Sequence, residues 1–306
     1  MEHPVDGILL VDKAEGEISF DVIRRIRQVL SARKVGHAGT LDPLATGLLI
    51  ILLGQGTKLS QWIMSQSKLY EGTLRLGIET DTLDSTGEIV AERPVPEGVA
   101  GKLEKACGKL MGEIQQRPPR FSAVKIKGQR AYRLARTGAS FELPERKVFV
   151  EKLEVLSVDL PFVTLRVRCS AGTYVRSLFA DLGKVLGTGA HLTALRRISS
   201  GGFRVENGVP SGKIQKGCDS SGLEKEVIPL YRALPGMAEV RVDRTLAGKI
   251  RKGYQPAWDE LGEGFCLENG VSGYVKITKG KELIAVASVG EETARGSKAK
   301  VVRVFH

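Results

Sequence analysis

Three short stretches of the 306-residue chain carry the side chains best suited to chemistry. They are GHAGTLDP with His37 and Asp42, KLYEG with Tyr70, and GTYVRS with Tyr174 and Arg176. A carboxylate can act as a nucleophile or a base, and a phenol or an imidazole can relay a proton. Each stretch lies at a turn beside an expected strand or helix, where functional groups commonly gather. These stretches are therefore the candidates for an active site.

Asp42 also has a purely structural interpretation. Asp followed by Pro43 is typical of the start of a short helix, with Asp42 as the N-cap and Gly47 as the stop. The apolar run 48–53 that follows is then a buried strand. The two tyrosines and the arginine have equally plain explanations, as core aromatics and a helix-surface cation. Residue types alone leave both interpretations open.

The charge balance points to a polyanionic partner. Lys and Arg exceed Asp and Glu by 11, and residues 117–147 alone hold nine Lys or Arg against two Glu. Phe121, Tyr132 and Phe141 are interleaved with these cations. Cations follow phosphates and aromatic rings stack on unpaired bases, so this segment is a candidate nucleic-acid contact. A solvated helix face is the structural alternative, and the pattern by itself favours neither.

The composition argues against several classes of protein. The four cysteines form no C-x-x-C pair and the four histidines show no metal-ligand spacing, so we expect no metal and no disulfide framework. No stretch approaches 18 uninterrupted apolar residues and the start lacks a basic leader, so we expect a cytoplasmic protein without a membrane span. Nucleotide-loop and serine-elbow motifs are missing. The cysteines are Cys107, Cys169, Cys218 and Cys266.

The apolar patterning indicates mixed α and β structure. It predicts a strand over 7–12, a helix that begins with Ser19 as N-cap, and a half-buried strand over 70–77. A second amphipathic helix is expected over 102–114, and a strand, glycine turn and helix over 163–187. A sheet that carries helices, with a basic excursion at 117–147, accounts for this order.

The last part of the chain has a different pattern. Residues 207–226 are rich in Gly, Ser, Lys and Asp, which is typical of a loop or linker. Beyond 238 we expect a short helix at RTLAGKIRKG and short strands separated by glycine turns. We therefore expect two domains, 1–235 and a small β-rich module, 236–306. The expected strands are EGFCLENG, GYVKITKG, KELIAVASVG and KAKVVRVFH.

Several long motifs together resemble one family, the bacterial tRNA pseudouridine synthase B (TruB) family. RKVGHAGTLDPLATGLLII matches its catalytic motif nearly residue for residue, and GILLVDK matches its opening motif. RPPRFSAVKIKGQRAYRLAR resembles its RNA-clasping insertion, and SAGTYVRSLFADLG and LTALRRISSGGF resemble its later motifs. The match runs from residue 7 to the end, more loosely over the last 70 residues, which resemble a PUA domain.

The resemblance implies an α+β fold. The expected catalytic domain is a mixed, largely antiparallel sheet with flanking helices and the insertion at 117–147, followed by a small β-barrel-like PUA domain. The chain departs from the family in its opening motif, where Ala14 replaces the usual Pro and Ile18 the usual Thr. A proline would stiffen that turn by fixing φ, so the departure concerns local rigidity.

The resemblance also implies a reaction, the isomerisation of uridine to pseudouridine without a cofactor. By the family's pattern Asp42 is the nucleophile, attacking either C6 of the uracil or C1′ of the ribose. Arg176 pairs with the aspartate and keeps it ionised above an apolar floor that would otherwise neutralise it. Tyr174 lies near C5 as proton acceptor or relay, and Tyr70 stacks on the flipped base.

Further residues have roles in binding by the same resemblance. His37 corresponds to a residue inserted near the vacated stack, where it holds the T loop, and Leu195 to an apolar contact beside the uracil. Lys13 is expected to be structural or near the pocket. Lys125 and Arg133 belong to the insertion that would clamp the stem-loop, mostly through phosphates and shape.

The substrate implied by the family is uridine 55 in the T loop of most elongator tRNAs, which must be extracted from its stack. We expect a monomer that binds the T-arm stem-loop. Two alternatives are an RNA-binding or RNA-folding protein without catalysis, and the related catalytic subunit of guide-RNA particles. The subunits of those particles need protein partners and generally lack the long basic insertion, so its presence favours a stand-alone enzyme.

Overall fold

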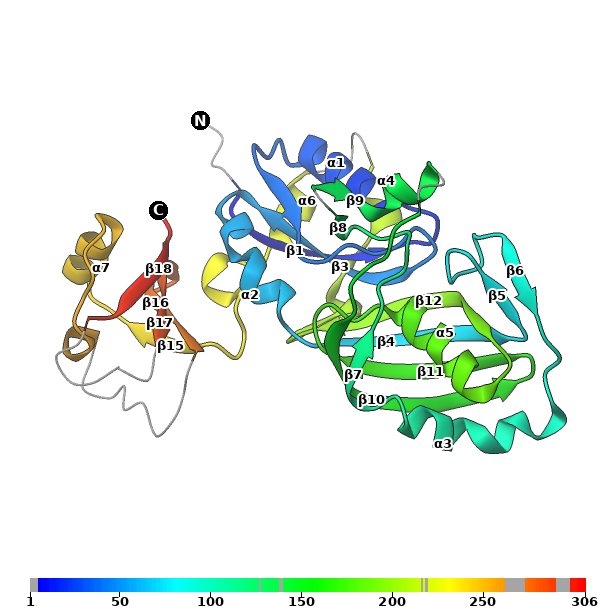
Figure 1. Ribbon diagram of the computed structural model, residues 1–306. Helices are drawn as coiled ribbons and strands as arrows, with labels where there is room; N and C mark the ends of the chain where they lie inside the picture. Colours follow the sequence, from blue (N-terminus) through cyan, green and yellow to red (C-terminus); the bar gives the residue numbers. More distant parts are fainter. Residues whose placement is uncertain are drawn as a thin grey trace.

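A mixed sheet with helices on it forms the larger part of the molecule (Figure 1). The computed structural model describes residues 5–126, 128–137, 140–215, 217, 220–261, 273–289 and 298–306. The main sheet has the strand order β14-β1-β3-β12-β4-β11-β10-β7, with β2 paired to β3 and β13 to β12. The β1–β14 and β3–β12 pairs are parallel, and the other pairs described in this sheet are antiparallel. The expected α+β class with a largely antiparallel sheet is confirmed.

The strands of the main sheet are β1 (Gly7–Lys13), β2 (Val35–His37), β3 (Thr46–Leu53), β4 (Lys68–Leu76), β7 (Gly112–Gln116), β10 (Arg146–Asp159), β11 (Phe162–Cys169), β12 (Ala190–Ser200), β13 (Phe203–Arg204) and β14 (Val209–Pro210). Two small ribbons pair β5 (Ile78–Thr80) with β6 (Ile89–Glu92), and β8 (Lys125–Ile126) with β9 (Gln129–Arg130). The helices before residue 230 are α1 (Ser19–Val29), α2 (Ser60–Met64), α3 (Leu103–Gly108), α4 (Ala131–Arg136), α5 (Val175–Leu186) and α6 (Ser220–Lys225).

Strand β3 is buried on both faces, which explains its unbroken apolar sequence. Leu49 and Ile51 belong to the core cluster that includes the inner side of α1, while Ile50 and Leu52 pack into a second cluster on the opposite face. The predicted buried strand is therefore confirmed. The strands predicted over 7–12 and 70–77 are also present, as β1 and β4.

The short helix expected between Asp42 and Gly47 is wrong. Residues 42–45 form a single turn, closed by the Ala45 N–H donating to the Asp42 carbonyl at 3.0 Å, and β3 begins at Thr46. Gly47 lies inside the strand with φ of +95°, and a Cβ there would come within 2.3 Å of the Arg197 carbonyl oxygen. This glycine therefore allows close contact between β3 and β12 rather than ending a helix.

Two further local predictions need correction. Ser19 is not the N-cap of α1, because Ile18 occupies that position and no side chain caps the helix. The helix expected over 102–114 ends at Gly108, and the chain continues as the edge strand β7 from Gly112. Gly112, the first residue of β7, has φ of +82°, a left-handed conformation that a helix running to residue 114 could not contain.

The chain beyond Ala238 forms a second sheet with a core of its own (Figure 1). Its helix α7 (Arg244–Arg251) and three of its strands fall where the sequence predicts them, whereas the EGFCLENG strand, together with Cys218 and Cys266, lies outside the described residues. The sheet order is β15 (Ala238–Arg241), β16 (Gly273–Lys279), β17 (Glu282–Val289) and β18 (Lys300–Val304). The 207–226 segment, expected as a loop, contains β14 and α6 as well.

This C-terminal module packs against the main sheet. Phe305 and Val286 share a buried cluster with Ile50 and Leu52 of β3. The Lys58 ammonium donates to the Val304 carbonyl at 2.8 Å and lies 5.3 Å from the centroid of the Phe305 ring. Among the described residues, no helix is long and apolar enough to cross a membrane.

Candidate active site

Five of the residues expected at the site line one small cavity of about 110 Å³. Asp42 comes from the turn before β3, Tyr70 from β4 and Leu195 from β12. Tyr174 and Arg176 come from the start of α5. These elements meet where β3 and β12 pair in parallel over two residue pairs, so the cavity lies in the middle of the sheet.

Asp42 and Arg176 form an ion pair at this cavity, with Nε of the arginine 2.9 Å from Oδ2 of the aspartate. The arginine side chain is only 5% exposed, whereas 34% of the aspartate side chain is accessible. The carboxylate is therefore accessible from the cavity, whereas the guanidinium that pairs with it is buried in the protein. This pairing is the one that the family resemblance implies.

The rest of the Arg176 guanidinium is fixed by three oxygen atoms. Nη1 donates to the Thr82 carbonyl at 2.9 Å, Nη2 donates to the Phe121 carbonyl at 3.0 Å, and the Asp84 carboxylate lies 3.4 Å from Nη1. Asp84 is itself held by Thr82 and Thr86, whose hydroxyls donate to its Oδ1 at 2.7 and 2.6 Å. A buried cation with this many partners has little freedom to turn away from Asp42.

The turn that carries Asp42 is anchored from three sides. Ser19 Oγ accepts from the Leu41 N–H at 3.1 Å and donates to the Leu41 carbonyl at 3.0 Å. Lys13 Nζ donates to the Pro43 carbonyl at 3.2 Å, and the buried Arg197 donates to the Gly39 carbonyl at 3.0 Å. Backbone atoms on both sides of Asp42 are thus fixed, which sets the direction of the carboxylate.

Burial raises the pKa of Asp42 above its ordinary value. The Arg176 cation lowers that pKa, and the nearby Asp84 charge raises it again. The apolar floor described in the sequence thus has its expected effect, and the guanidinium offsets it only in part. A carboxylate held this way is more basic and more reactive than one in water.

Tyr70 presents a neutral ring to the cavity. Its side chain is buried, and burial raises the pKa of the phenol, which remains protonated near neutrality. Leu195, on the adjacent strand β12, lies beside it as an apolar wall. An aromatic face and a leucine side chain together suit a planar, uncharged ring such as a nucleobase.

Tyr174 is fixed through its backbone. Gln116, at the end of β7, donates from Nε2 to the Tyr174 carbonyl at 3.0 Å and accepts the Tyr174 N–H on Oε1 at 2.8 Å. The amide of this fully buried glutamine pairs with both backbone groups of Tyr174, as a neighbouring strand would, at the start of α5. The phenol is therefore placed at the wall of the cavity by a side chain from the sheet edge.

Four of the expected residues do not line this cavity, namely Lys13, His37, Lys125 and Arg133. Lys13 is fully buried, and its ammonium donates to the carbonyls of Ala14, Glu17 and Pro43, so it holds the loop rather than facing the opening. His37 is partly buried at the end of β2, and burial lowers the pKa of its imidazole, which is then neutral near pH 7.

Lys125 and Arg133 lie on the insertion, exposed to solvent. In Figure 1 the insertion runs from the β7 edge across to α1, with β8, β9 and α4 at its far end. Arg133 and Arg136 both lie near the ring of Tyr132, at 6.0 and 5.8 Å. Arg176 donates a hydrogen bond to the carbonyl of Phe121, which lies near the start of this insertion, so the insertion is connected to the active-site arginine.

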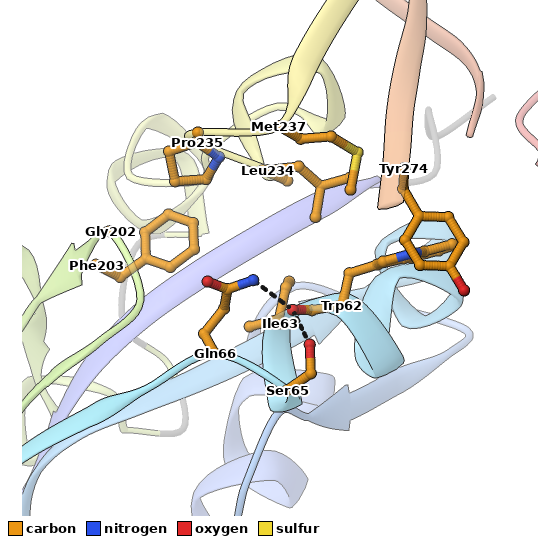
Figure 2. Close-up of a pocket in the computed structure, with 12 residues that line it drawn as sticks. Trp62, Ile63, Ser65, Gln66, Gly202, Phe203, Leu234, Pro235, Met237 and Tyr274 are labelled. Atoms are coloured by element: carbon orange, nitrogen blue, oxygen red, sulfur yellow. Dashed lines mark hydrogen bonds between the residues drawn. The ribbon is translucent and has the colours of Figure 1, made fainter. Parts of the chain in front are cut away.

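A larger cavity, of about 290 Å³, lies where the C-terminal module meets the main sheet (Figure 2). Apolar and aromatic side chains dominate its lining, among them Trp62, Phe203 and Leu234. Tyr274 stands edge-on to Trp62, with ring centroids 5.5 Å apart. Within the part of the chain that the structure describes, no carboxylate, cation or thiol lines this cavity, so the candidate chemistry is at the smaller one.

Of the residues that hold Asp42 and Arg176 in place, Asp84 and Arg197 were missed from the sequence. Asp84 occurs in TDTLDSTG, a loop of acidic and hydroxyl residues, and that composition is also common in plain surface turns. Arg197 is one of two adjacent arginines in β12; it is 2% exposed and donates to the Leu48 carbonyl at 2.6 Å. A fully buried arginine inside a strand leaves no distinctive signal in one sequence.

The opening-motif departure has a local effect. The Ala14 N–H donates to Ser211 Oγ at 2.9 Å, a bond that the usual proline could not make. Ile18 is 54% exposed and leaves the start of α1 without a side-chain cap.

Comparisons with known proteins agree with this geometry. The profile of the TruB family pseudouridylate synthase N-terminal domain matches residues 27–175, and the tRNA pseudouridylate synthase B C-terminal domain matches residues 176–234. The tRNA pseudouridine synthase B of Syntrophus aciditrophicus (strain SB) is 38% identical over 99% of this chain and 99% of its own length. The protein of that name from Opitutus terrae is 42% identical over 76% of this chain and 96% of its own.

Solved structures show the same architecture. A chain in the crystal structure of a Cbf5-Nop10-Gar1 complex is 26% identical, with a TM-score of 0.73 over 99% of this chain and 85% of its own. A chain in the structure of an H/ACA RNP bound to a substrate RNA containing 2′-deoxyuridine gives the same TM-score at 25% identity, over 99% of this chain and 86% of its own. Because two family profiles match in series and a relative aligns over essentially the whole length, the chain belongs to the TruB family of pseudouridine synthases.

Proposed function

We propose that this enzyme isomerises uridine 55 in the T loop of tRNAs to pseudouridine, with Asp42 as the nucleophile. The observation that carries the proposal is the Asp42 carboxylate, paired to a buried guanidinium and open to a cavity walled by two tyrosines. The relatives that match over most of the chain are named tRNA pseudouridine synthase B, which supports tRNA as the substrate.

The reaction moves the uracil without adding or losing atoms. The carboxylate of Asp42 attacks C6 of the uracil or C1′ of the ribose, and the N1–C1′ bond breaks. The base rotates in the cavity, and C5 forms the new bond to C1′. If the attack was at C1′, the new C5–C1′ bond displaces the Asp42 carboxylate; if it was at C6, the Asp42–C6 bond breaks after C5 has bonded to C1′. The C5 proton passes to Tyr174, directly or by relay, and N1 takes up a proton to give the product.

The cavity walls support each stage of this scheme. Tyr70 stacks on the extruded base and Leu195 contacts its edge, which offsets part of the few kcal/mol that unstacking costs. Arg176 keeps Asp42 charged when the site closes over the uridine and excludes water. His37, neutral at its position on β2, contacts the T loop instead of transferring protons.

The rest of the RNA is held outside the cavity. The insertion 117–147 clamps the T-arm stem-loop through cations such as Lys125 and Arg133. The module from residue 236 onward is a second RNA-binding domain of PUA type, which extends the contact. The enzyme acts on tRNA as a monomer in the cytoplasm.

The catalytic subunit of a guide-RNA particle is the second candidate, since the structural neighbours are parts of such assemblies. The sequence relatives named for tRNA are 35–42% identical, whereas those neighbours are 25–26% identical. The higher identity favours a stand-alone tRNA enzyme.

The test is tritium release from tRNA labelled at uracil C5, with the purified protein and no guide RNA. We expect release of one tritium per tRNA, and none from a tRNA in which uridine 55 is replaced by cytidine. Release from the cytidine-substituted tRNA would contradict the assigned position, and no release from either would contradict stand-alone activity.

A further inference from the structure

A second guanidinium, that of Arg146, lies against the active site from the sheet edge. Its central carbon is 4.4 Å from the centroid of the Tyr174 ring, a close cation–π contact. Arg146 is the first residue of β10, where the chain returns from the insertion to the sheet. The guanidinium therefore lies against the ring of the tyrosine that lines the cavity with Asp42.

The edge of this guanidinium lacks hydrogen-bond partners. Nε and Nη2 of Arg146 are buried and have no partner among the described residues. Nearby carboxylates are engaged elsewhere: Glu145 pairs with Arg117 at 3.2 Å, and Glu113 pairs with Lys147 at 2.9 Å. A buried N–H group of a charged side chain lowers the stability of the protein when it has no acceptor. The two unpaired nitrogens of Arg146 therefore indicate a ligand that supplies acceptor oxygens.

The position of Arg146 is coupled to that of Gln116. The two residues are register partners across the β7–β10 pair, at the points where the insertion leaves and rejoins the sheet. Gln116 fixes the Tyr174 backbone through two hydrogen bonds, and Arg146 covers the Tyr174 ring. One strand pair thus holds the whole of Tyr174, and it is the pair from which the proposed RNA clamp extends.

We propose that Arg146 binds a backbone phosphate of the RNA beside the extruded uridine and thereby positions the Tyr174 ring against the base. This inference rests on the proposed function of the same site. A guanidinium can pack its face on an aromatic ring while its edge makes two parallel bonds to phosphate oxygens, which an ammonium cannot do. Binding of the phosphate fixes the guanidinium plane, and through it the plane of the phenol.

The first test separates RNA binding from the chemical step with two variants. Arg146→Gln removes the charge, and we expect RNA binding about tenfold weaker or more, with the salt slope of binding reduced by about one. Arg146→Lys keeps the charge, and we expect it to restore the salt slope but not the single-turnover rate at saturating RNA. Lys152→Gln is the control: it lies on the same strand, is exposed and pairs with Glu154.

The second test replaces the phosphate itself. A T-arm stem-loop with a neutral methylphosphonate on one linkage flanking the target uridine weakens binding to the wild-type enzyme, and we expect no further loss with Arg146→Gln at that linkage. Equal additional loss at both flanking linkages, or behaviour of Arg146→Gln like that of Lys152→Gln, would overturn the proposal. Because the wild-type enzyme is assayed on unmodified RNA in parallel, absence of product there would instead contradict the proposed function.

Discussion

At the scale of single residues, the site depends on a carboxylate whose surroundings oppose its charge. Burial raises the pKa of Asp42, Arg176 lowers it, and Asp84 raises it from the far side of the same guanidinium. The carboxylates of Asp42 and Asp84 thus share one guanidinium, that of Arg176, and the pKa of Asp42 reflects both neighbours. The basicity of Asp42, the proposed nucleophile, is set by that balance and not by Arg176 alone.

This balance predicts a pH dependence. The proposed mechanism requires the Asp42 carboxylate, so we expect activity to fall on acidification with a midpoint above the ordinary aspartate value of 3.8, because the pKa of Asp42 is raised. Asp84→Asn removes the charge that raises this pKa, so we expect the acid midpoint to move to lower pH. Single-turnover rates against pH measure it. Asp181→Asn, partly exposed on α5 and paired with Lys184, is the control, and an upward shift for Asp84→Asn would contradict the account.

At the scale of elements, the start of α1 is a weak point next to the site. Ile18 occupies the N-cap and is 54% exposed, so the first helical N–H groups have no side-chain acceptor. Ile18→Thr is expected to stabilise the protein by about 1 kcal/mol, because a threonine hydroxyl can cap the helix. Denaturant unfolding measures the gain. Ile18→Val keeps the branched shape without the hydroxyl, and an equal gain from that variant would contradict the capping argument.

The insertion is the element expected to make the salt-dependent contacts. Lys125→Gln and Arg133→Gln should each weaken tRNA binding and reduce the slope of log K against log salt by about one, since each removes one phosphate contact. Lys184→Gln, which neutralises an exposed cation on α5, should leave the slope unchanged. Titrations at several salt concentrations decide this, and unchanged slopes for both insertion variants would mean that the insertion is not the clamp.

Elements with a strong hydrophobic period were predictable, and those governed by tertiary contact were not. β1, β3, β4 and α5 follow from their patterns. The Asp42 turn was mistaken for a helix because the Asp-Pro pair and the later glycine satisfy helix-boundary rules, whereas Gly47 is needed for the close approach of Arg197. Ser19 was predicted to cap the helix because serine is a common N-cap. Its hydroxyl instead bonds to the backbone of Leu41, 22 residues away, and a sequence pattern does not reveal so distant a contact.

The residues of the site are likewise divided into those that the sequence identified and those that only the structure revealed. Asp42, Tyr174 and Arg176 could be named because the motifs around them are long, and Asp42 and Arg176 lie in contact. Asp84, Arg197 and Arg146 act through contacts between distant elements, which no short motif encodes. Their roles needed the structure.

At the scale of the whole molecule, one buried cluster joins the C-terminal module to the main sheet. Phe305 is 1% exposed within it, so Phe305→Ala should lower the free energy of unfolding by about 3–5 kcal/mol, through lost burial and a cavity. Phe149→Ala removes a ring that is 52% exposed and should cost much less. Urea unfolding of both variants measures the two changes in unfolding free energy. If Phe305→Ala costs no more than Phe149→Ala, burial of Phe305 at the junction adds little stability.

The most direct measurement of the central claim is pseudouridine formation by Asp42→Asn. The amide keeps the size and shape of the side chain, and Arg176 keeps its contacts with Asp84, Thr82 and Phe121, so the variant should fold. We expect tRNA binding to be unchanged and the single-turnover rate to fall about a thousandfold or more, as for the loss of an enzymatic nucleophile. A folded Asp42→Asn protein that forms pseudouridine at the wild-type rate would contradict the account.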